Sequence, residues 1–296
     1  MLLLPVHLHL LQLISYISTS PFPNSIQKFL YAILFNNVQR EEIRVAILQM
    51  EGTNCEYETY LAFKELGTKP EYVHLKEIER GIKNVEDYQC IFLPGGFSAG
   101  DYVRAGAIFA ARLRAGVAGK LKKFVENGGV MVGICNGFQV LIEMGFLPAL
   151  NGISDEPEAC LATNDSNRFE CRQTLVRHEG RGCKLTSNIP EGKIGLIPSA
   201  HMEGKLVFKD DEYAQEVNEK QVVFRYVDMD GNLADYPWNP NGSYANIAGI
   251  CNDEGNIMGM MPHPERAFHP WQNPGWKGND GREVFEGIVG YIERKW

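Results

Sequence analysis

The sequence predicts an α/β fold in which a mostly parallel sheet carries helices on both faces. Three observations favour this fold class. Short apolar segments alternate with helix-like segments four times between residues 44 and 145. The apolar segments are continuous, which is typical of strands that are buried on both faces of a sheet. After residue 150 the pattern changes to shorter β-rich pieces, which we expect to add antiparallel strands.

Four strands are expected in the first half of the chain. Each is short and rich in apolar residues, and each is followed by a turn, a polar loop or a helix-like run. They are RVAILQM (44–50), EYVHL (71–75), CIFLPGG (90–96) and VMVGI (130–134). Because strands joined through helices form right-handed βαβ units, the third and fourth should be neighbours, with functional loops at their carboxyl ends.

The first helix is expected over residues 54–67. It should begin at Asn54, a favourable N-cap, and end at Gly67, a favourable terminator. Its expected apolar residues at roughly helical spacing are Tyr57, Leu61 and Leu66.

Two further helices are expected from the same kind of pattern. One long helix should cover residues 105–127 and stop at Gly128 and Gly129. The last helix should begin with a capping pair made by Asp280 and Glu283. Its expected apolar stripe is Val284, Phe285, Ile288, Val289 and Ile292.

Residues 44–296 contain no linker-like stretch, so we expect them to form one domain. Residues 1–43 have a different composition. They are apolar, but they contain Pro5 and Gln12 and lack both a basic start and a small-residue cleavage site, so they are weak candidates for a membrane span or a signal peptide. We expect a dispensable N-terminal extension or an artefact of the gene model.

The composition and net charge indicate which kinds of molecule this chain binds. With 44% hydrophobic and 22% charged residues among 296, the chain can bury an ample core. The net charge of −8 argues against a nucleic-acid surface, which normally carries a basic patch. Small molecules or proteins are therefore the expected partners, with no nucleic acid and no membrane.

Seven cysteines are present, an odd number without short paired spacing. This pattern predicts neither a disulfide framework nor a metal site, and it fits a reducing, cytoplasmic location. We interpret all of them except Cys135 as small buried hydrophobic residues.

Cys135 lies in Gly133-Ile134-Cys135-Asn136-Gly137, directly after the fourth strand. This form is typical of a sharp strand-to-helix turn that exposes a nucleophile, and the glycines avoid crowding in the tight backbone. The helix N-terminus would favour the reactive thiolate. Taken alone, the pattern is equally compatible with a buried thiol at a close helix–sheet contact.

A thiol nucleophile needs a base and an orienting group. MMPHPERAF places His263 between two prolines, with Glu265 two residues later. Acyl transfer also needs donors for the oxyanion, and these could be N–H groups of the glycine-rich loop LPGGFSAGD (93–101) and of Asn136. Phosphate binding by this loop is the weaker interpretation, because the loop lacks both the Walker lysine and the G-x-G-x-x-G spacing.

The motifs PGGFS, GICNGFQ and MPHPER together resemble the class I glutamine amidotransferases. The stretches EGTNCE, GFSAGD, NPNGS and MMPHPERA are similar to one subfamily, the glutaminase subunits of phosphoribosylformylglycinamidine synthase in purine biosynthesis. The resemblance runs from about Val45 to the C-terminal helix. It implies a flavodoxin-like fold.

The resemblance also implies site residues. Cys135 would attack the side-chain amide of L-glutamine, His263 would serve as base and then acid, and Glu265 would orient His263. The loop that matches the oxyanion hole and glutamine pocket contains Gly95, Gly96 and Phe97. Gln139 matches a glutamine-binding position, although a solvated helix residue is the alternative.

No cofactor is expected in this chain. The resemblance implies that the carbonyl oxygen of formylglycinamide ribonucleotide is activated in another subunit. The resemblance implies a separate synthetase subunit that uses ATP and Mg²⁺, and it leaves open a small bridging subunit. Ammonia would need a path protected from water, because free ammonia is protonated at neutral pH and ammonium is not a nucleophile.

Two departures from the subfamily are visible. The loop HMEGKL (201–206) has Met202 and Lys205 where related chains more often have glycine and arginine, and the N-terminal extension has no counterpart. Two other functions stay open at this point. One is a stand-alone γ-glutamyl hydrolase or cysteine peptidase of the same fold, and the other is a non-catalytic regulatory module.

Overall fold

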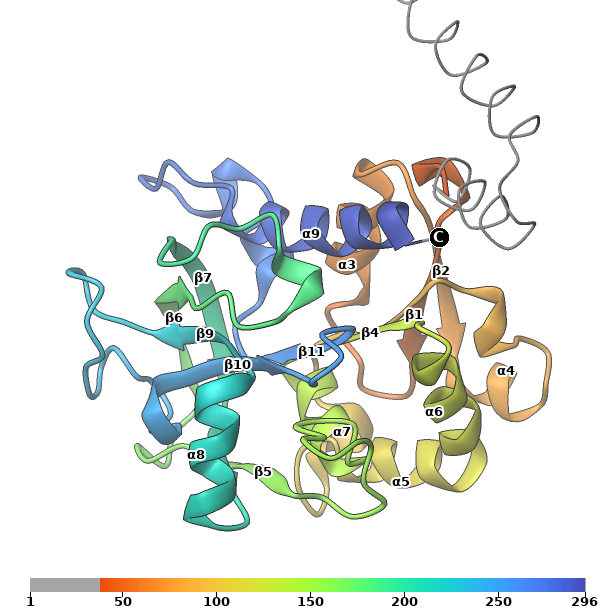
Figure 1. Ribbon diagram of the computed structural model, residues 1–296, viewed down its shortest axis with the longest axis horizontal. Helices are drawn as coiled ribbons and strands as arrows, with labels where there is room; N and C mark the ends of the chain where they lie inside the picture. Colours follow the sequence, from red (N-terminus) through yellow and green to blue (C-terminus); the bar gives the residue numbers. More distant parts are fainter. Residues whose placement is uncertain (1–37, 296) are drawn as a thin grey trace, which may run out of the picture.

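A nine-stranded sheet forms the centre of the computed structural model, which describes residues 38–295 (Figure 1). The strand order is β2-β1-β3-β4-β11-β10-β9-β6-β7. Residues 1–37, most of the expected N-terminal extension, lie outside the described residues, so that expectation stays a prediction. None of the helices within residues 38–295 is long and apolar enough to cross a membrane.

Five neighbouring strands make up the parallel half of the sheet. They are β2 (Lys69–His74), β1 (Arg44–Gln49), β3 (Cys90–Leu93), β4 (Val130–Ile134) and β11 (Ile257–Met260). Their burial is nearly continuous except in β2 at the edge, which explains why the other four read as apolar runs. The expected pairing of the third and fourth strands is confirmed, with Cys90 opposite Val130. The order β2-β1-β3-β4-β11 is the flavodoxin-like arrangement.

The β-rich second half of the chain extends this sheet with antiparallel strands, as expected. These are β10 (Ile247–Cys251), β9 (Val222–Tyr226), β6 (Glu170–His178) and β7 (Ile194–His201). A separate two-stranded sheet pairs β5 (Ala159–Thr163) with β8 (Glu203–Phe208). The chain therefore leaves one sheet at His201 and enters the other at Glu203, which places the HMEGKL loop at their junction.

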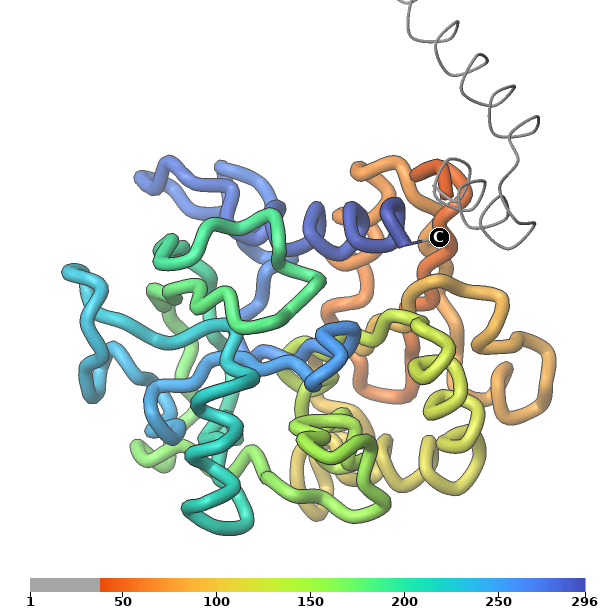
Figure 2. Tube along the Cα trace, in the orientation of Figure 1, coloured from red at the N-terminus to blue at the C-terminus, as the bar shows by residue number. Residues whose placement is uncertain are grey.

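Helices cover both faces of the sheet, as Figures 1 and 2 show, with α3 and α9 side by side on one face and α5, α6 and α7 on the other. The helices are α3 (Glu56–Glu65), α4 (Leu75–Glu79), α5 (Ala107–Gly116), α6 (Ala118–Glu126), α7 (Asn136–Glu143), α8 (Asp211–Lys220) and α9 (Asp280–Lys295). The predicted fold class is confirmed.

Three details of the helices predicted over residues 54–67 and 105–127 were wrong. The single helix over residues 105–127 is two helices, because Val117 leaves helical geometry at φ −140° and ψ 1°. The N-cap of α3 is Cys55, one residue after Asn54, and no side chain caps this end. Tyr57 and Leu61 are exposed, since α3 packs through Ala62 and Phe63 instead.

The expected capping pair of α9 does not cap its own helix. Asp280 accepts hydrogen bonds from the backbone N–H of Leu196 at 2.8 Å and from the indole of Trp276 at 2.6 Å. Glu283 forms an ion pair with Lys193. Both carboxylates therefore connect α9 to neighbouring segments, while the predicted apolar stripe of the helix is buried throughout.

The two halves of the chain share an aromatic cluster around Phe285 of α9. Its ring centroid lies 5.0 Å from that of Phe63 and 5.8 Å from that of Phe92 on β3. Phe285→Ala is expected to lower the free energy of unfolding by about 3–5 kcal/mol, because it leaves a cavity in this core. Urea denaturation measures the change. The exposed Phe169 provides a control, and a loss for Phe285→Ala no larger than for Phe169→Ala would contradict the core role.

Candidate active site

Cys135 occupies a strained corner between β4 and α7. Its backbone has φ 51° and ψ −106°, a conformation that costs a non-glycine residue about 1–3 kcal/mol and is concentrated at functional sites. Its N–H donates to the carbonyl of Met260 at 2.8 Å, which fixes the corner against β11. The residue is 5% exposed, and its sulfur lies 3.6 Å from the carbonyl oxygen of Ala200.

The flanking glycines are required by close backbone contacts. A Cβ on Gly133 would lie 2.5 Å from the carbonyl oxygen of Gly137, and a Cβ on Gly137 would lie 1.9 Å from the carbonyl oxygen of Leu93. The close helix–sheet packing that the sequence allowed as an alternative is therefore present. This packing explains why residues 133 and 137 are glycine, but it does not explain the strained backbone of Cys135. The corner thus serves both the packing and the placement of the thiol.

His263 follows β11 and begins the short 3-10 helix η6 (Pro264–Arg266). Its Nδ1 lies 2.6 Å from Oε1 of Glu265, and both side chains are buried. Since a carboxylate only accepts, Nδ1 carries the proton and Nε2 is the nitrogen left for the substrate side. Burial by itself lowers the pKa of His263, but the charges of Glu265 and then Cys135 raise that pKa well above its ordinary value.

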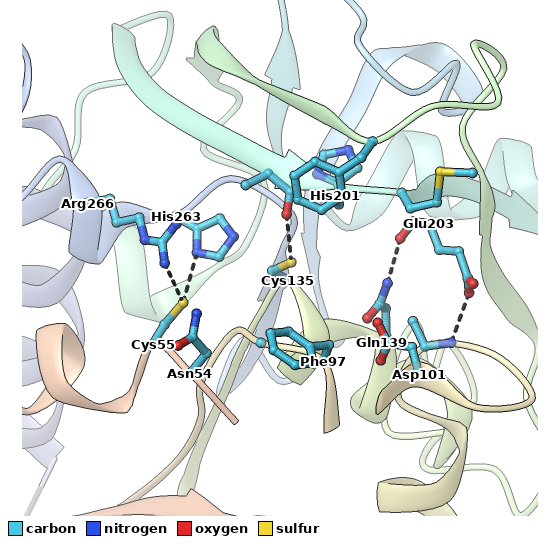
Figure 3. Close-up of a pocket in the computed structure, with 15 residues that line it drawn as sticks. Asn54, Cys55, Phe97, Asp101, Cys135, Gln139, His201, Glu203, His263 and Arg266 are labelled. Atoms are coloured by element: carbon cyan, nitrogen blue, oxygen red, sulfur yellow. Dashed lines mark hydrogen bonds between the residues drawn. The ribbon is translucent and has the colours of Figure 1, made fainter. Parts of the chain in front are cut away.

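These side chains meet at one pocket of about 200 Å³. Figure 3 shows Cys135 near the middle of its wall, with His263 on one side and Gln139 on the other. The pocket is lined by Asn54, Cys55, Gly96, Phe97, Asp101, Ala105, Cys135, Gln139, Phe169, Ala200, His201, Met202, Glu203, His263 and Arg266. Three sequence-distant motifs therefore lie together at the carboxyl ends of β3, β4 and β11, where the fold class places functional loops.

The three predicted residues of the glycine-rich loop, Gly95, Gly96 and Phe97, do not all have the same role in the pocket. Gly95 accepts the N–H groups of Asn54 and Cys55 through its carbonyl, and a Cβ there would lie 2.7 Å from Cε1 of His263. Phe97 lines the pocket, but its N–H donates to the carbonyl of Gly52 at 3.0 Å, so it is no oxyanion donor. Within residues 38–295, no hydrogen bond uses the N–H of Gly96.

Asn136, at the start of α7, combines two features. Its backbone N–H is a helix-end donor of the kind that has no partner within the helix, and it directly follows Cys135. Its side-chain oxygen accepts the N–H of Ser98 at 3.2 Å, which ties the glycine-rich loop to the helix. An oxyanion-binding role for the N–H groups of Gly96 and Asn136 stays a prediction.

Gln139 is buried on the pocket wall, so the alternative of a solvated helix residue was wrong. Its Nε2 donates to the carbonyl of Glu203 at 2.6 Å, and its Oε1 accepts from Asn136 Nδ2 at 2.9 Å. The first of these bonds connects α7 to the start of β8, and the second lies within α7. A glutamine-binding role for Gln139 stays a prediction.

The interpretation of the other cysteines as buried hydrophobic residues was wrong in two cases. Cys160 and Cys171 are exposed. Cys55 is buried, but it lines the pocket, with its sulfur 3.2 Å from Arg266 Nη2 and 3.8 Å from His263 Nδ1. Burial raises the pKa of the Cys55 thiol. No local pattern distinguishes Cys55 as a pocket residue, because its partners His263 and Arg266 lie more than 200 residues away.

Cys55, His263 and Glu265 form the only group of potential metal ligands found within residues 38–295. The Nδ1 proton of His263 points to Glu265, and the guanidinium of Arg266 donates to Cys55. A cation beside the sulfur disfavours a second cation. Hydrogen bonds within this group therefore hold the imidazole in place.

Asp101 and Glu203 also line the pocket and were missed from the sequence. Burial and the charge of Glu203 raise the pKa of Asp101 to about 6, so its carboxyl group is mostly ionised at neutral pH. Asp101 belongs to a loop in which Ala99, Asp101 and Val103 all have positive φ. Of the departures noted in HMEGKL, Met202 lines the pocket and Lys205 pairs with Asp165 at 2.6 Å.

A family model described as a CobB/CobQ-like glutamine amidotransferase domain matches residues 42–292. The chain belongs to this amidotransferase family. The amidotransferase is 48% identical over 271 residues to the phosphoribosylformylglycinamidine synthase subunit PurQ of Archaeoglobus fulgidus, covering 87% of this chain and 100% of the relative. It is 47% identical to the same subunit of Picrophilus torridus, with 83% and 97% of the two chains covered.

Among solved structures, the amidotransferase is similar to a chain of PurLQS from Thermotoga maritima. The TM-score is 0.67 at 35% sequence identity, and the match covers 85% of this chain and 99% of the other. The likeness therefore extends over nearly the whole length of the relatives as well as over the pocket motifs.

Proposed function

We propose that this chain is the glutaminase subunit of phosphoribosylformylglycinamidine synthase and hydrolyses L-glutamine to glutamate and ammonia. The observation that carries the proposal is the strained Cys135 corner in a pocket shared with the His263–Glu265 pair. The near full-length similarity to subunits that bear this name supports the choice within the family.

The chemistry follows from these groups. The Cys135 thiol loses its proton to His263 and attacks the amide carbon of glutamine, and the developing oxyanion is stabilised by the N–H groups of Gly96 and Asn136. A raised pKa allows His263 to hold that proton and then donate it to the leaving nitrogen, which departs as ammonia. Water attacks the resulting thioester, and glutamate leaves.

Ammonia made here would be used by a separate synthetase subunit that converts formylglycinamide ribonucleotide to the amidine with ATP and Mg²⁺. A small bridging subunit is part of this proposal, and the name of the Thermotoga maritima assembly, PurLQS, supports a complex of several components. We place the complex in the cytoplasm, consistent with seven unpaired cysteines.

Glutamate release from glutamine tests the proposal. The purified chain alone should be weakly active, and adding the synthetase subunit, its nucleotide substrate and ATP should stimulate release, with an equal amount of amidine formed. High activity that the partner leaves unchanged would indicate an independent hydrolase. No release in either mixture would favour a regulatory module and would contradict the proposal.

A further inference from the structure

Arg266 donates to a sulfur atom, although a buried carboxylate directly precedes it in the sequence. Its Nη2 lies 3.2 Å from Sγ of Cys55, and its only ion pair within residues 38–295 is a long one, at 3.9 Å, to Glu58. Glu265 uses Oε1 to accept the Nδ1 proton of His263, while its buried Oε2 has no hydrogen-bond partner within the described residues. A guanidinium and a carboxylate normally form charge-assisted hydrogen bonds, so something in this site keeps the two apart.

Cys55 is held firmly where these side chains meet. Its N–H donates to the carbonyl oxygen of Gly95 at 3.1 Å, and its own carbonyl accepts the hydroxyl of Thr59 at 2.7 Å. A Cβ on Gly95 would lie 3.2 Å from the sulfur and 2.7 Å from Cε1 of His263, so the sulfur packs beside the imidazole. In Figure 3 the dashed lines from Arg266 and from His263 both end at this sulfur. The sulfur therefore contacts the guanidinium and the imidazole at once.

The Cys55 thiol is neutral at physiological pH, because burial raises its pKa above the ordinary value. A neutral thiol is only a weak hydrogen-bond acceptor, so it attracts a guanidinium far less than a carboxylate does. It nevertheless occupies one donor of Arg266 and the space next to the imidazole. Its effect on the guanidinium is thus one of position and not of strong attraction.

Titratable and charged groups from several elements act on the imidazole of His263. They are Cys55 at the start of α3, Cys135 at the β4–α7 corner, His201 on β7, Tyr226 on β9, and Glu265 and Arg266 on η6. Burial lowers the pKa of His201 to about 3 and raises the pKa of Tyr226 above its ordinary value, so both are neutral. The charges that remain are those of Glu265, Arg266 and the nucleophile itself. A change in the contact between Glu265 and Arg266 must therefore alter how strongly His263 holds its proton.

We propose that Cys55 is a positioning residue that keeps the guanidinium of Arg266 away from Glu265, so that this carboxylate serves the imidazole of His263 alone. This inference rests on the proposed glutaminase function and adds a residue that acts through Glu265. Without the Cys55 side chain, Arg266 would donate to the free Oε2 of Glu265. The carboxylate would then share between two cations the negative charge that stabilises the protonated imidazole.

The fall of kcat/KM at high pH tests this inference. Glutamate release from glutamine is measured against pH in the complete complex with the synthetase subunit, its nucleotide substrate and ATP. At high pH the pair formed by Cys135 and His263 loses the proton that the leaving nitrogen needs, so the midpoint of the fall reports how strongly the imidazole holds that proton. Partial unfolding of a variant lowers the height of the profile but does not move this midpoint.

Cys55→Ala should move the midpoint to lower pH by about one pH unit, because a cation paired with Glu265 weakens its attraction for the protonated imidazole. Cys55→Ser keeps an acceptor beside Arg266 and should leave the midpoint close to its natural value. When Cys55→Ala is combined with Arg266→Gln, the competing cation is gone and the midpoint should return to its natural value or rise above it. Cys171→Ala, which alters an exposed thiol on β6, is the matched control and should leave the midpoint unchanged.

The combined variant separates positioning from a merely structural role. A structural role of Cys55 predicts effects that add, so that Arg266→Gln would not restore the midpoint. The inference would be overturned by an unshifted midpoint in Cys55→Ala, by an equal shift in Cys55→Ser, or by a shift that Arg266→Gln leaves in place. Absence of glutamate release by the natural complex would instead overturn the proposed function.

Discussion

Replacing Cys135 by alanine is expected to abolish formation of the amidine from glutamine and to leave its formation from ammonium salts intact. The physical reason is that the thioester cannot form without the thiol, whereas ammonia supplied from solution bypasses this pocket. We expect a loss of at least about a thousandfold with glutamine, in line with removal of a nucleophile from other triads. Amidine formation by the complete complex, with glutamine or ammonium chloride, measures both activities.

Two further cysteine variants make this result specific. Cys171→Ala alters an exposed thiol on β6 and should change neither activity. Cys55→Ala removes the other thiol of the pocket, which lies against His263 and Arg266. If Cys55→Ala abolished the glutamine-dependent reaction while Cys135→Ala retained it, the nucleophile would be Cys55 and the assignment of Cys135 would be wrong.

The parallel half of the fold could be predicted from the sequence because its signals are local. A strand buried on both faces, such as β4, is an apolar run, and a turn that needs glycine shows glycine in the sequence. The Cys135 corner combines both signals within eight residues. For the same reason, the His263–Glu265 contact was predictable, since two residues separate its members.

The rest of the site could not be predicted in this way. Asp101 and Glu203 are 102 positions apart, and neither lies in a pattern that distinguishes it from a solvated carboxylate. They meet because η3 (Ser98–Asp101) follows β3 while β8 departs from the main sheet after His201, and this topology has no local signature. The error at α3 has a similar cause, because its buried face is set by the contacts with β1, β2 and α9 and not by propensity.

Replacing His263 by alanine is expected to slow the labelling of Cys135 by a diazo-ketone glutamine analogue by about a hundredfold or more. The imidazole is buried and its Nε2 has no partner within the described part of the chain, so this nitrogen is available to accept the proton of the thiol. Mass spectrometry of the intact chain gives the labelling rate. Labelling of the variant at the natural rate would exclude His263 as the base.

Glu265→Gln separates orientation from proton transfer at the same site. The side-chain amide oxygen introduced at position 265 can still accept the Nδ1 proton of His263, so the ring keeps its tautomer. Labelling should therefore be slowed less than in His263→Ala. The carboxylate is the largest of the influences that raise the pKa of His263, and its removal should leave an imidazole that holds the proton less strongly. Release of ammonia needs that proton, so thioester formation should be affected less than complete turnover of glutamine. Equal effects of Glu265→Gln and His263→Ala on labelling would show that Glu265 takes part in proton transfer itself.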